Sequence, residues 1–283
     1  MKEYRVKRHK LQTVHSTNSY LKELNGGDAS FNMELATAEF QTAGRGQKGN
    51  SWESDEGANL LFSILIHPTY VQASKQFCIS QAIALAVVDA LKEIVHDPSI
   101  AEPFTVKWPN DIYWGSKKIA GILIENELYG STIKDCIIGV GLNINQQLFK
   151  SDAPNPISLY NILGVEVDRE ELLNTVIRNF IRNIIMIESK QTTQLHNSYM
   201  QTLFRKEGFH KYRDEDGEFM AAIHTVRDDG RLILLDANGK ERVYEFKEVP
   251  TPSASPHSGS MPMKAVTDFS GAITRESVRV RPM

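Results

Sequence analysis

The feature that most constrains the fold is a change of pattern along the chain near residue 203. Before it, short apolar runs such as residues 59–66 stand beside long helical patterns such as residues 76–94, which have the spacing of a mostly buried helix. After it, short strand-like runs are separated by Asp-Gly and Asn-Gly pairs, which tolerate the positive φ of tight hairpin turns. The sequence therefore predicts a region of mixed strands and helices, residues 1–203, and a small antiparallel barrel of SH3 size, residues 204–249.

The first region contains further strand and helix patterns. Strands are expected at residues 106–113, 118–128 and 132–144. Residues 168–187 predict an amphipathic helix with a face buried in the core, because apolar side chains recur at helical spacing at Leu172, Val176, Phe180 and Ile184. Asp168 is expected to cap this helix, since its carboxylate can accept a hydrogen bond from an amide of the first turn.

Composition and charge narrow the class of protein. The net charge of −3 gives no support for a general nucleic-acid or membrane-surface partner. No apolar stretch approaches the ~20 residues that cross a bilayer, and no apolar segment of a signal peptide follows the basic N-terminus. The two cysteines, Cys78 and Cys136, have no metal-ligand spacing and are expected to be reduced core residues. We therefore expect a cytoplasmic protein without a protein-held metal site.

The C-terminal segment, residues 250–283, differs from the rest of the chain. It begins PTPSASPHSGSMP and lacks a sustained helix or strand period. Such a composition cannot bury a core of its own. We expect this segment either to be disordered or to be foreign to the domain.

Residues 39–52, EFQTAGRGQKGNSW, form a glycine-rich basic segment. Three glycines with Arg45 and Lys48 between them offer backbone amides and positive charge, which together suit a phosphate or a carboxylate. The pattern is neither a Walker A loop nor a dinucleotide-binding GxGxxG. On its own it is equally compatible with a solvated turn.

Two lysine-containing segments follow. Residues 107–111 read KWPND, and a strand pattern then begins with Lys117 and Lys118. Lys118 would sit at the mouth of a buried strand, and Gly121 would let a ligand approach the backbone closely. The alternative is a hairpin with surface lysines.

Residues 139–143, GVGLN, end an apolar strand pattern. Gly139 and Gly141 remove the side chains from one face of the strand, which could leave a slot for a flat ligand or allow a close helix–strand contact. Residues 16–18, Ser-Thr-Asn, open a short helix pattern. Helix capping explains them fully, although hydroxyls at a helix start also bind polar ligand groups.

Taken together and in this order, these segments resemble the biotin protein ligase family. The resemblance covers residues 11–145 and continues more loosely to residue 249. It implies an α+β fold in which a mixed sheet with flanking helices, related to class II aminoacyl-tRNA synthetases, precedes a small SH3-like β-barrel. It also implies the monofunctional type without an N-terminal helix-turn-helix, because only fifteen residues precede Ser16.

The resemblance implies an ATP-dependent ligase that forms biotinyl-5'-AMP and then transfers biotin to a lysine of a biotin carboxyl carrier protein. The expected catalytic residues are Lys118, Arg45 and Asp111. The expected biotin-binding residues are Ser16, Thr17, Asn18, Gln41, Gly44, Arg45, Lys118, Gly121, Gly139 and Gly141. The residues expected to bind ATP, which would arrive with Mg²⁺, are Arg45, Gly46, Gln47, Lys48, Trp52, Asn110 and Asn143.

The implied chemistry accounts for these residue types. A biotin carboxylate and an α-phosphate must meet in the first step, so cations are the main requirement. In the second step a lysine amine, with an ordinary pKa of about 10.4, must lose its proton before it attacks, with Asp111 orienting it. No enzyme nucleophile is needed.

Several points stay open at this level. Many family members carry a second arginine where this chain has Gln47, so weaker retention of the adenylate is expected. A lipoate or octanoate ligase of the same fold and an inactive homologue are the alternative functions. No nucleic-acid or membrane partner is expected, and the protein could be a monomer or a homodimer.

Overall fold

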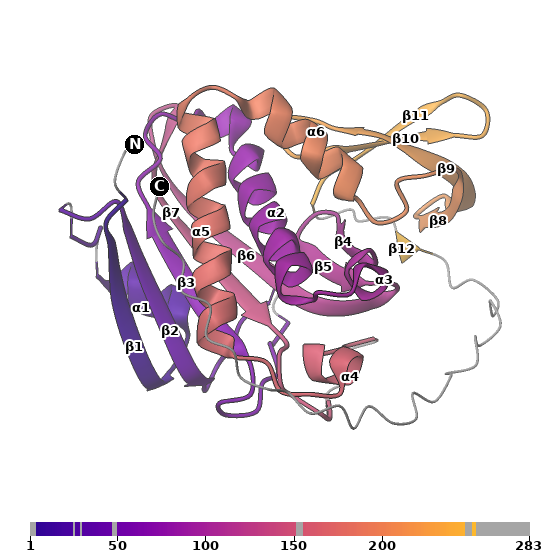
Figure 1. Cartoon of the computed structure of the whole chain (residues 1–283). Coiled ribbons are helices and arrows are strands. Elements are labelled where there is room, and N and C mark those ends of the chain that lie inside the picture. The colour runs from indigo at the N-terminus through magenta and orange to yellow at the C-terminus, as the bar shows by residue number, and fades with distance from the viewer. Residues whose placement is uncertain are drawn as a thin grey trace, which may run out of the picture.

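The computed structural model describes residues 4–24, 26–28, 30–46, 50–150 and 155–246, and the backbone of residues 251–252. Its centre is a seven-stranded sheet in the order β1-β2-β3-β7-β6-β5-β4 (Figure 1). β1 and β2 are parallel and the other neighbours are antiparallel, so the sheet is mixed. The strands are β1 Val6–Val14, β2 Met33–Gln41, β3 Leu60–Ile66, β4 Phe104–Lys107, β5 Asp111–Trp114, β6 Lys117–Tyr129 and β7 Thr132–Leu142.

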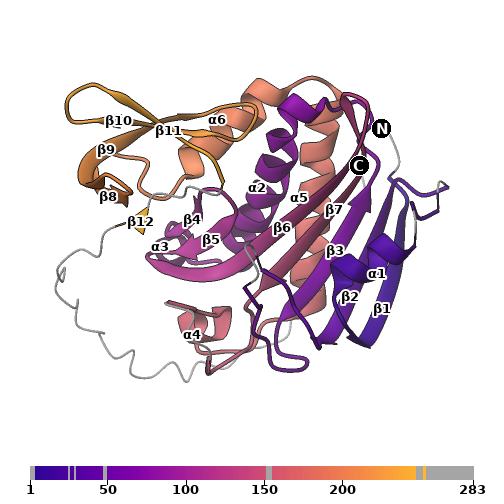
Figure 2. The ribbon, with the colours of Figure 1, turned by 180° about the vertical axis from the view of Figure 1, so that it is seen from behind.

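Helices cover both faces of this sheet. α2 Phe77–Ile94 and α5 Arg169–Glu188 lie against one face with α6 Thr192–Thr202 beside α2, and α1 Thr17–Glu23 lies on the opposite face (Figures 1 and 2). Every residue of β3 is buried between these layers, which explains its continuous apolar run. The short helices are η2 Ala73–Lys75, α3 Pro98–Ala101 and α4 Leu159–Leu163. The predicted α+β fold class is confirmed.

α5 agrees closely with its sequence pattern. The stripe of Leu172, Val176, Phe180 and Ile184 is buried. Asp168 is the N-cap, and its carboxylate accepts hydrogen bonds from the amides of Glu170 and Glu171 at 2.9 and 3.1 Å. Among the described helices, none is long and apolar enough to cross a lipid bilayer.

The single strand expected at residues 106–113 is wrong. The chain turns at Trp108, Pro109 and Asn110, and this turn divides the segment into the antiparallel strands β4 and β5. Proline lacks the amide hydrogen that a strand ladder requires, so the turn forms where the KWPND segment places it. Lys107 therefore pairs with Asp111 across the base of a hairpin.

A second, antiparallel sheet follows the first in the order β11-β10-β9-β8-β12. Its tight turns use Gly217, Gly230 and Gly239, all with positive φ, as the Asp-Gly and Asn-Gly pairs predict. The residues Thr251–Pro252 pair with β8, whereas the rest of the predicted tail, from residue 253, lies outside the described residues. The strands are β8 His210–Asp214, β9 Gly217–Val226, β10 Leu232–Asp236, β11 Glu241–Tyr244 and β12 Thr251–Pro252.

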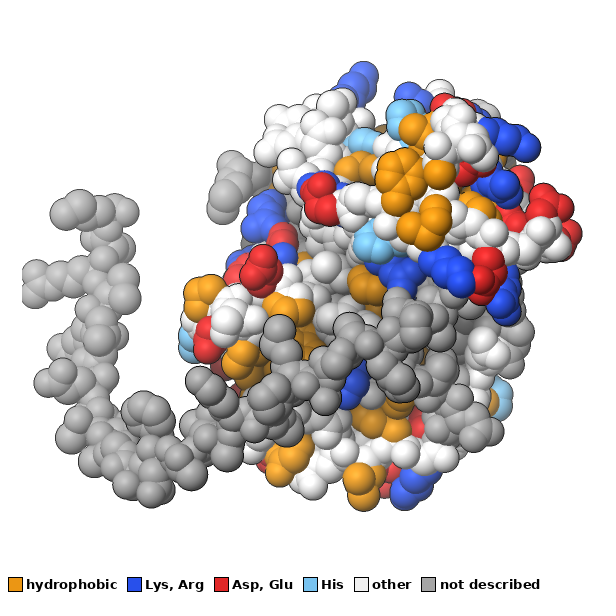
Figure 3. Space-filling model, turned by 90° about the vertical axis from the view of Figure 1, so that its right-hand side faces the viewer, with side chains coloured by type: hydrophobic (Ala, Val, Ile, Leu, Met, Phe, Trp, Pro, Cys, Tyr) orange, Lys and Arg blue, Asp and Glu red, His pale blue; other side chains and the backbone are white. Residues whose placement is uncertain are grey.

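The second sheet joins the first through the hairpin turn of KWPND. Trp108 Nε1 donates a hydrogen bond to the Gly230 carbonyl at 2.9 Å, and Phe246 packs against both Trp108 and Phe77. On the face of the molecule that carries this sheet, acidic and basic side chains are interspersed (Figure 3). Arg242, for example, bonds both Asp214 and Asp236 there.

Candidate functional site

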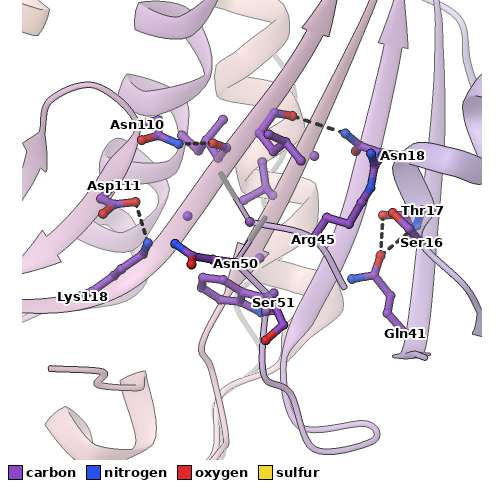
Figure 4. A pocket seen from close by; sticks show the side chains of 18 of the residues that line it. Ser16, Thr17, Asn18, Gln41, Arg45, Asn50, Ser51, Asn110, Asp111 and Lys118 are labelled. Atoms are coloured by element: carbon purple, nitrogen blue, oxygen red, sulfur yellow. Dashed lines mark hydrogen bonds and ion pairs between the residues drawn. The ribbon is translucent and has the colours of Figure 1, made fainter. Parts of the chain in front are cut away.

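A cavity opens on the face of the central sheet that carries α1. Its floor is formed by the middle of β6 and β7, where Gly121 pairs with Gly141 and Leu123 with Gly139. The start of α1, the end of β2, the loop after it and the KWPND turn form its walls. The two sides differ in chemistry: Lys118 and Asp111 lie across the cavity from Thr17 and Gln41 (Figure 4).

The side near α1 is a network of neutral polar groups. The Thr17 backbone amide donates to Gln41 Oε1 at 2.7 Å, and the Thr17 hydroxyl lies 3.1 Å from the same oxygen. The Ser63 hydroxyl, on β3, lies 2.6 Å from both Thr17 Oγ1 and Asn18 Oδ1. Thr17, Asn18 and Ser63 are all at most 4% exposed. This part of the site is therefore built before any ligand arrives.

The glycines of β6 and β7 make room for two side chains. A Cβ on Gly139 would lie 2.3 Å from Asn18 Oδ1, and one on Gly141 would lie 2.4 Å from the Trp52 indole. Gly121 likewise would bring a Cβ to 3.0 Å from the Trp52 ring. The strand face without side chains that GVGLN predicts is present. Asn18, from helix α1, and Trp52 both pack against it, so the alternative of a close helix–strand contact also holds.

Two cations line the cavity, each paired with a carboxylate: Lys118 lies across the cavity from α1, whereas Arg45 lies beside Asn18 (Figure 4). Lys118 Nζ lies 2.6 Å from Asp111 Oδ1, and Arg45 lies 2.9 Å from Glu125 Oε2. These four side chains are 22–44% exposed, so solvent screens both pairs and each is worth little on its own. Arg45 and Lys118 can consequently exchange these partners for an incoming anion.

Lys107 adds a further cation to the cavity wall. Its ammonium group donates to the Tyr113 hydroxyl at 3.0 Å and lies 5.0 Å from the centre of that ring. Because the Tyr113 hydroxyl is neutral, this hydrogen bond orients the Lys107 side chain without neutralising its positive charge.

Most of the site residues expected from the sequence line this one cavity. They are Ser16, Thr17, Asn18, Gln41, Arg45, Gly46, Trp52, Asn110, Asp111, Lys118, Gly121, Gly139 and Gly141. Gly44 and Asn143 are not among its lining residues: Gly44 packs beneath Trp52, and the Asn143 amide donates to the Ile157 carbonyl at 3.1 Å. Gln47 and Lys48 lie outside the described residues.

Ser16 corrects one reading of the sequence. It occupies the N-cap position of α1, but its side chain makes no capping hydrogen bond. Capping therefore does not explain Ser16 fully, and Ser16 is one of the residues that line the cavity.

The sequence reading missed further residues at the cavity. Ser63 and Glu125 were signalled only weakly, as a polar residue inside the apolar run of β3 and a carboxylate after the apolar run of β6. Within the described residues, no group of three or more His, Cys, Asp or Glu side chains could hold a metal ion. Ser63 and Glu125 lie behind the lining residues. The lining residues to which the sequence reading gave no individual role are Asn50, Ser51, Phe62, Lys107, Trp108, Pro109, Ile122, Leu123 and Val140.

Comparison with known proteins shows which family and which solved structures this chain is similar to. Residues 11–143 match the model of the biotin/lipoate A/B protein ligase family. The biotin–acetyl-CoA-carboxylase ligase of Paracoccus denitrificans is 28% identical over 236 residues, which cover 82% of this chain and 95% of that protein. A similar solved structure is that of biotin protein ligase from Aquifex aeolicus in complex with biotin and ATP. The two structures superpose with a TM-score of 0.69 and share 28% sequence identity, and the match covers 84% of this chain and 96% of that one.

Longer relatives match as well. The bifunctional ligase/repressor BirA of Bacillus spizizenii is 28% identical over 241 residues, covering 82% of this chain and 70% of that protein. Across four bifunctional relatives, the matched part spans between 48% and 70% of their length.

Proposed function

We propose, from the premise that this chain belongs to the biotin protein ligase family, that it joins biotin to a lysine of an acceptor protein through biotinyl-5'-AMP. One observation carries the proposal: a single cavity has a buried neutral network beside α1 and two cations, Arg45 next to that network and Lys118 across the cavity from it. Biotin has this same division, with a neutral ureido ring at one end and a carboxylate at the other.

The neutral side suits the ureido ring. The Thr17 amide occupies Gln41 Oε1, which turns the Gln41 amide nitrogen, a donor, away from Thr17. The ring offers two N–H donors and one carbonyl acceptor, so Ser16, Thr17 and Gln41 are assigned to bind it. A site that hydrogen-bonds such groups rejects ligands that lack them, because its buried polar atoms would be left unpaired.

The two cations suit adenylate formation. A biotin carboxylate oxygen attacks the α-phosphorus of ATP, the bond to the β-phosphate oxygen breaks, and pyrophosphate leaves. Arg45 and Lys118 would leave Glu125 and Asp111 and bind the anions that meet there, which offsets their repulsion. Trp52 and Asn110 are assigned to the nucleotide. Magnesium would enter with ATP as part of the substrate, since it is usually held by phosphates and only one or two protein groups.

The second step consumes the adenylate. The amine of the acceptor lysine loses its proton and attacks the carbonyl carbon of the mixed anhydride, and AMP leaves. Once Lys118 turns to the phosphate, Asp111 becomes available to orient the amine. The 2.6 Å contact between the two side chains places both at the same point of the cavity.

The proposed acceptor is the biotin carboxyl carrier domain of a biotin-dependent carboxylase, as the names of the Paracoccus and Mycobacterium tuberculosis relatives suggest. Residues 1–203 would form the catalytic domain and residues 204–249 a C-terminal domain of SH3 type. The cytoplasm is the proposed compartment, in keeping with the unpaired thiols of Cys78 and Cys136.

The test is exchange of labelled pyrophosphate into ATP by the purified full-length protein, with biotin, with lipoate and without an acid. We expect exchange that depends on biotin, because the neutral network matches the ureido ring. Lipoate lacks that ring. Exchange with lipoate alone would assign the chain to lipoate ligation, which the matched family also includes. Exchange with neither acid would refute adenylate formation.

A further inference from the structure

The hydrogen bonds under the cavity form a chain whose ends differ in charge. The chain runs from Thr17 through Ser63 and Asn18 to Glu125, whose Oε2 accepts from Asn18 Nδ2 at 2.7 Å. Arg45 binds the same carboxylate oxygen at 2.9 Å. Four structural elements, α1, β3, β6 and the loop after β2, therefore meet in one network.

Glu125 sets the orientation of the Asn18 side chain. The Asn18 amide nitrogen donates to the carboxylate, and turning the amide over would put its oxygen against a negative charge. A longer contact of the same nitrogen with the Leu123 carbonyl, at 3.4 Å, favours the same orientation. Asn18 Oδ1 must consequently face Ser63, where the absence of a side chain on Gly139 leaves it space. The amide oxygen can only accept, so Ser63 has to donate to it.

Ser63 in turn sets the Thr17 hydroxyl. A serine has a single hydroxyl proton, and this one lies 2.6 Å from two oxygens, Thr17 Oγ1 and Asn18 Oδ1. Because its proton points to Asn18, the short contact with Thr17 is satisfied only if Thr17 donates to Ser63. The other acceptor within reach of the Thr17 hydroxyl, Gln41 Oε1, is farther away, at 3.1 Å, and already accepts from the Thr17 amide. Ser63 is fully buried, so water cannot supply another donor.

We propose that Ser63 and Glu125 are positioning residues that fix the proton direction of this chain, so that the Thr17 hydroxyl meets the ligand as a hydrogen-bond acceptor. The inference rests on the proposed function, in which the donor is a ureido N–H of biotin. Neither residue lines the cavity. Both act through Thr17 and Asn18. Together they determine whether the site prefers a ligand group that donates a hydrogen bond or one that accepts it.

The test is calorimetric titration of the full-length Ser63→Ala protein with biotin alone. Without the Ser63 hydroxyl, Asn18 Oδ1 loses its donor, and the Thr17 proton can turn either to Gln41 Oε1 or into the cavity. We expect biotin to bind about tenfold more weakly, equivalent to about 1.4 kcal/mol. Thr175→Val is the control, because it removes a buried hydroxyl from α5 on the far side of the sheet and should leave biotin affinity unchanged.

Selectivity separates positioning from a general loss of structure. Two biotin analogues, each methylated on one ureido nitrogen, remove one donor at a time. The wild type should reject the analogue methylated on the nitrogen that faces Thr17 by roughly a hundredfold, because a mismatched hydrogen bond costs at least this much in a site built to make it. In Ser63→Ala we expect this preference to shrink to about tenfold, whereas a merely destabilised protein would bind all three ligands less and keep their ratio.

Glu125→Gln tests the other end of the chain and remains informative if Ser63→Ala does not fold. A glutamine can present either its oxygen or its amide to Asn18, so the direction of the chain then depends only on the 3.4 Å contact of Asn18 with the Leu123 carbonyl, and the preference between the analogues should fall about threefold. Unchanged selectivity in every folded variant would overturn the inference while leaving the proposed function intact. A wild type that binds no biotin would overturn both.

Discussion

The two sides of the cavity are stabilised by different physics. On the neutral side, Thr17, Asn18 and Ser63 are at most 4% exposed and their hydrogen bonds are satisfied within the protein. On the charged side, across the cavity, Lys118 is 33% exposed and solvent screens its ion pair with Asp111. Arg45, which lies beside Asn18, is 44% exposed, and its ion pair with Glu125 is screened in the same way. Breaking a buried network leaves costly unpaired groups, whereas exchanging an exposed ion pair costs little. The neutral side is therefore fitted for selection of the ligand, and the charged side for a reaction in which partners change.

Lys118→Ala is expected to have the largest effect and tests this division directly. The variant removes a cation from the point where two anions meet, so biotin-dependent pyrophosphate exchange should fall about a hundredfold, or ~3 kcal/mol. Biotin affinity should fall much less, because the neutral network is untouched. The rate is measured by exchange and the affinity by calorimetry. The neighbouring exposed Lys117, changed to alanine, is the control. Equal losses of rate and affinity would break the division between the two sides.

The two glycines of β7 allow a sharper comparison, with an expected effect of about thirtyfold. Gly139→Ala would place a Cβ 2.3 Å from Asn18 Oδ1 and displace it from the neutral network. Overpacking of this kind costs roughly 2 kcal/mol, and the loss should appear in biotin affinity. Gly141→Ala would displace the Trp52 indole instead, so the loss should appear in the KM for ATP. If both variants change biotin affinity alike, Asn18 and Trp52 do not serve separate ends of the ligand.

Local patterns in the sequence predicted what depends on neighbouring residues. The cap at Asp168, the stripe of α5 and the bare face of Gly139 follow from spacing, and the structure confirms them. The strand predicted at residues 106–113 runs through the turn at Pro109, because apolar and aromatic neighbours continue the strand pattern on both sides of it.

Contacts between distant segments could not be predicted in this way. Arg45 and Glu125 are 80 positions apart, and Ser63 lies 45 positions from Asn18. Only the fold shows that the two expected cations already have carboxylate partners. Resemblance to a family predicts the residues that contact a ligand. The residues that position those side chains can be identified only from the three-dimensional structure.

Asp111→Asn carries the smallest expected effect, about tenfold, and asks whether the charged side serves both steps. The substitution keeps the shape of the side chain but removes the counter-charge from Lys118, whose ammonium lies 2.6 Å away. Pyrophosphate exchange should change little, because Lys118 must leave Asp111 before it binds the phosphate. Transfer from preformed biotinyl-5'-AMP to an acceptor should slow about tenfold, which is less than the roughly hundredfold or more that loss of a general base costs, because Asp111 orients the amine and asparagine can still hydrogen-bond it. Both rates are measured on the same preparation, the transfer rate as a single turnover.

Asp89→Asn is the control, because Asp89 also forms an exposed ion pair, with Arg182 at 2.8 Å, on the helix layer. Equal slowing of the two steps would mean that Asp111 only positions Lys118, and the amine of the acceptor would then need another group to orient it.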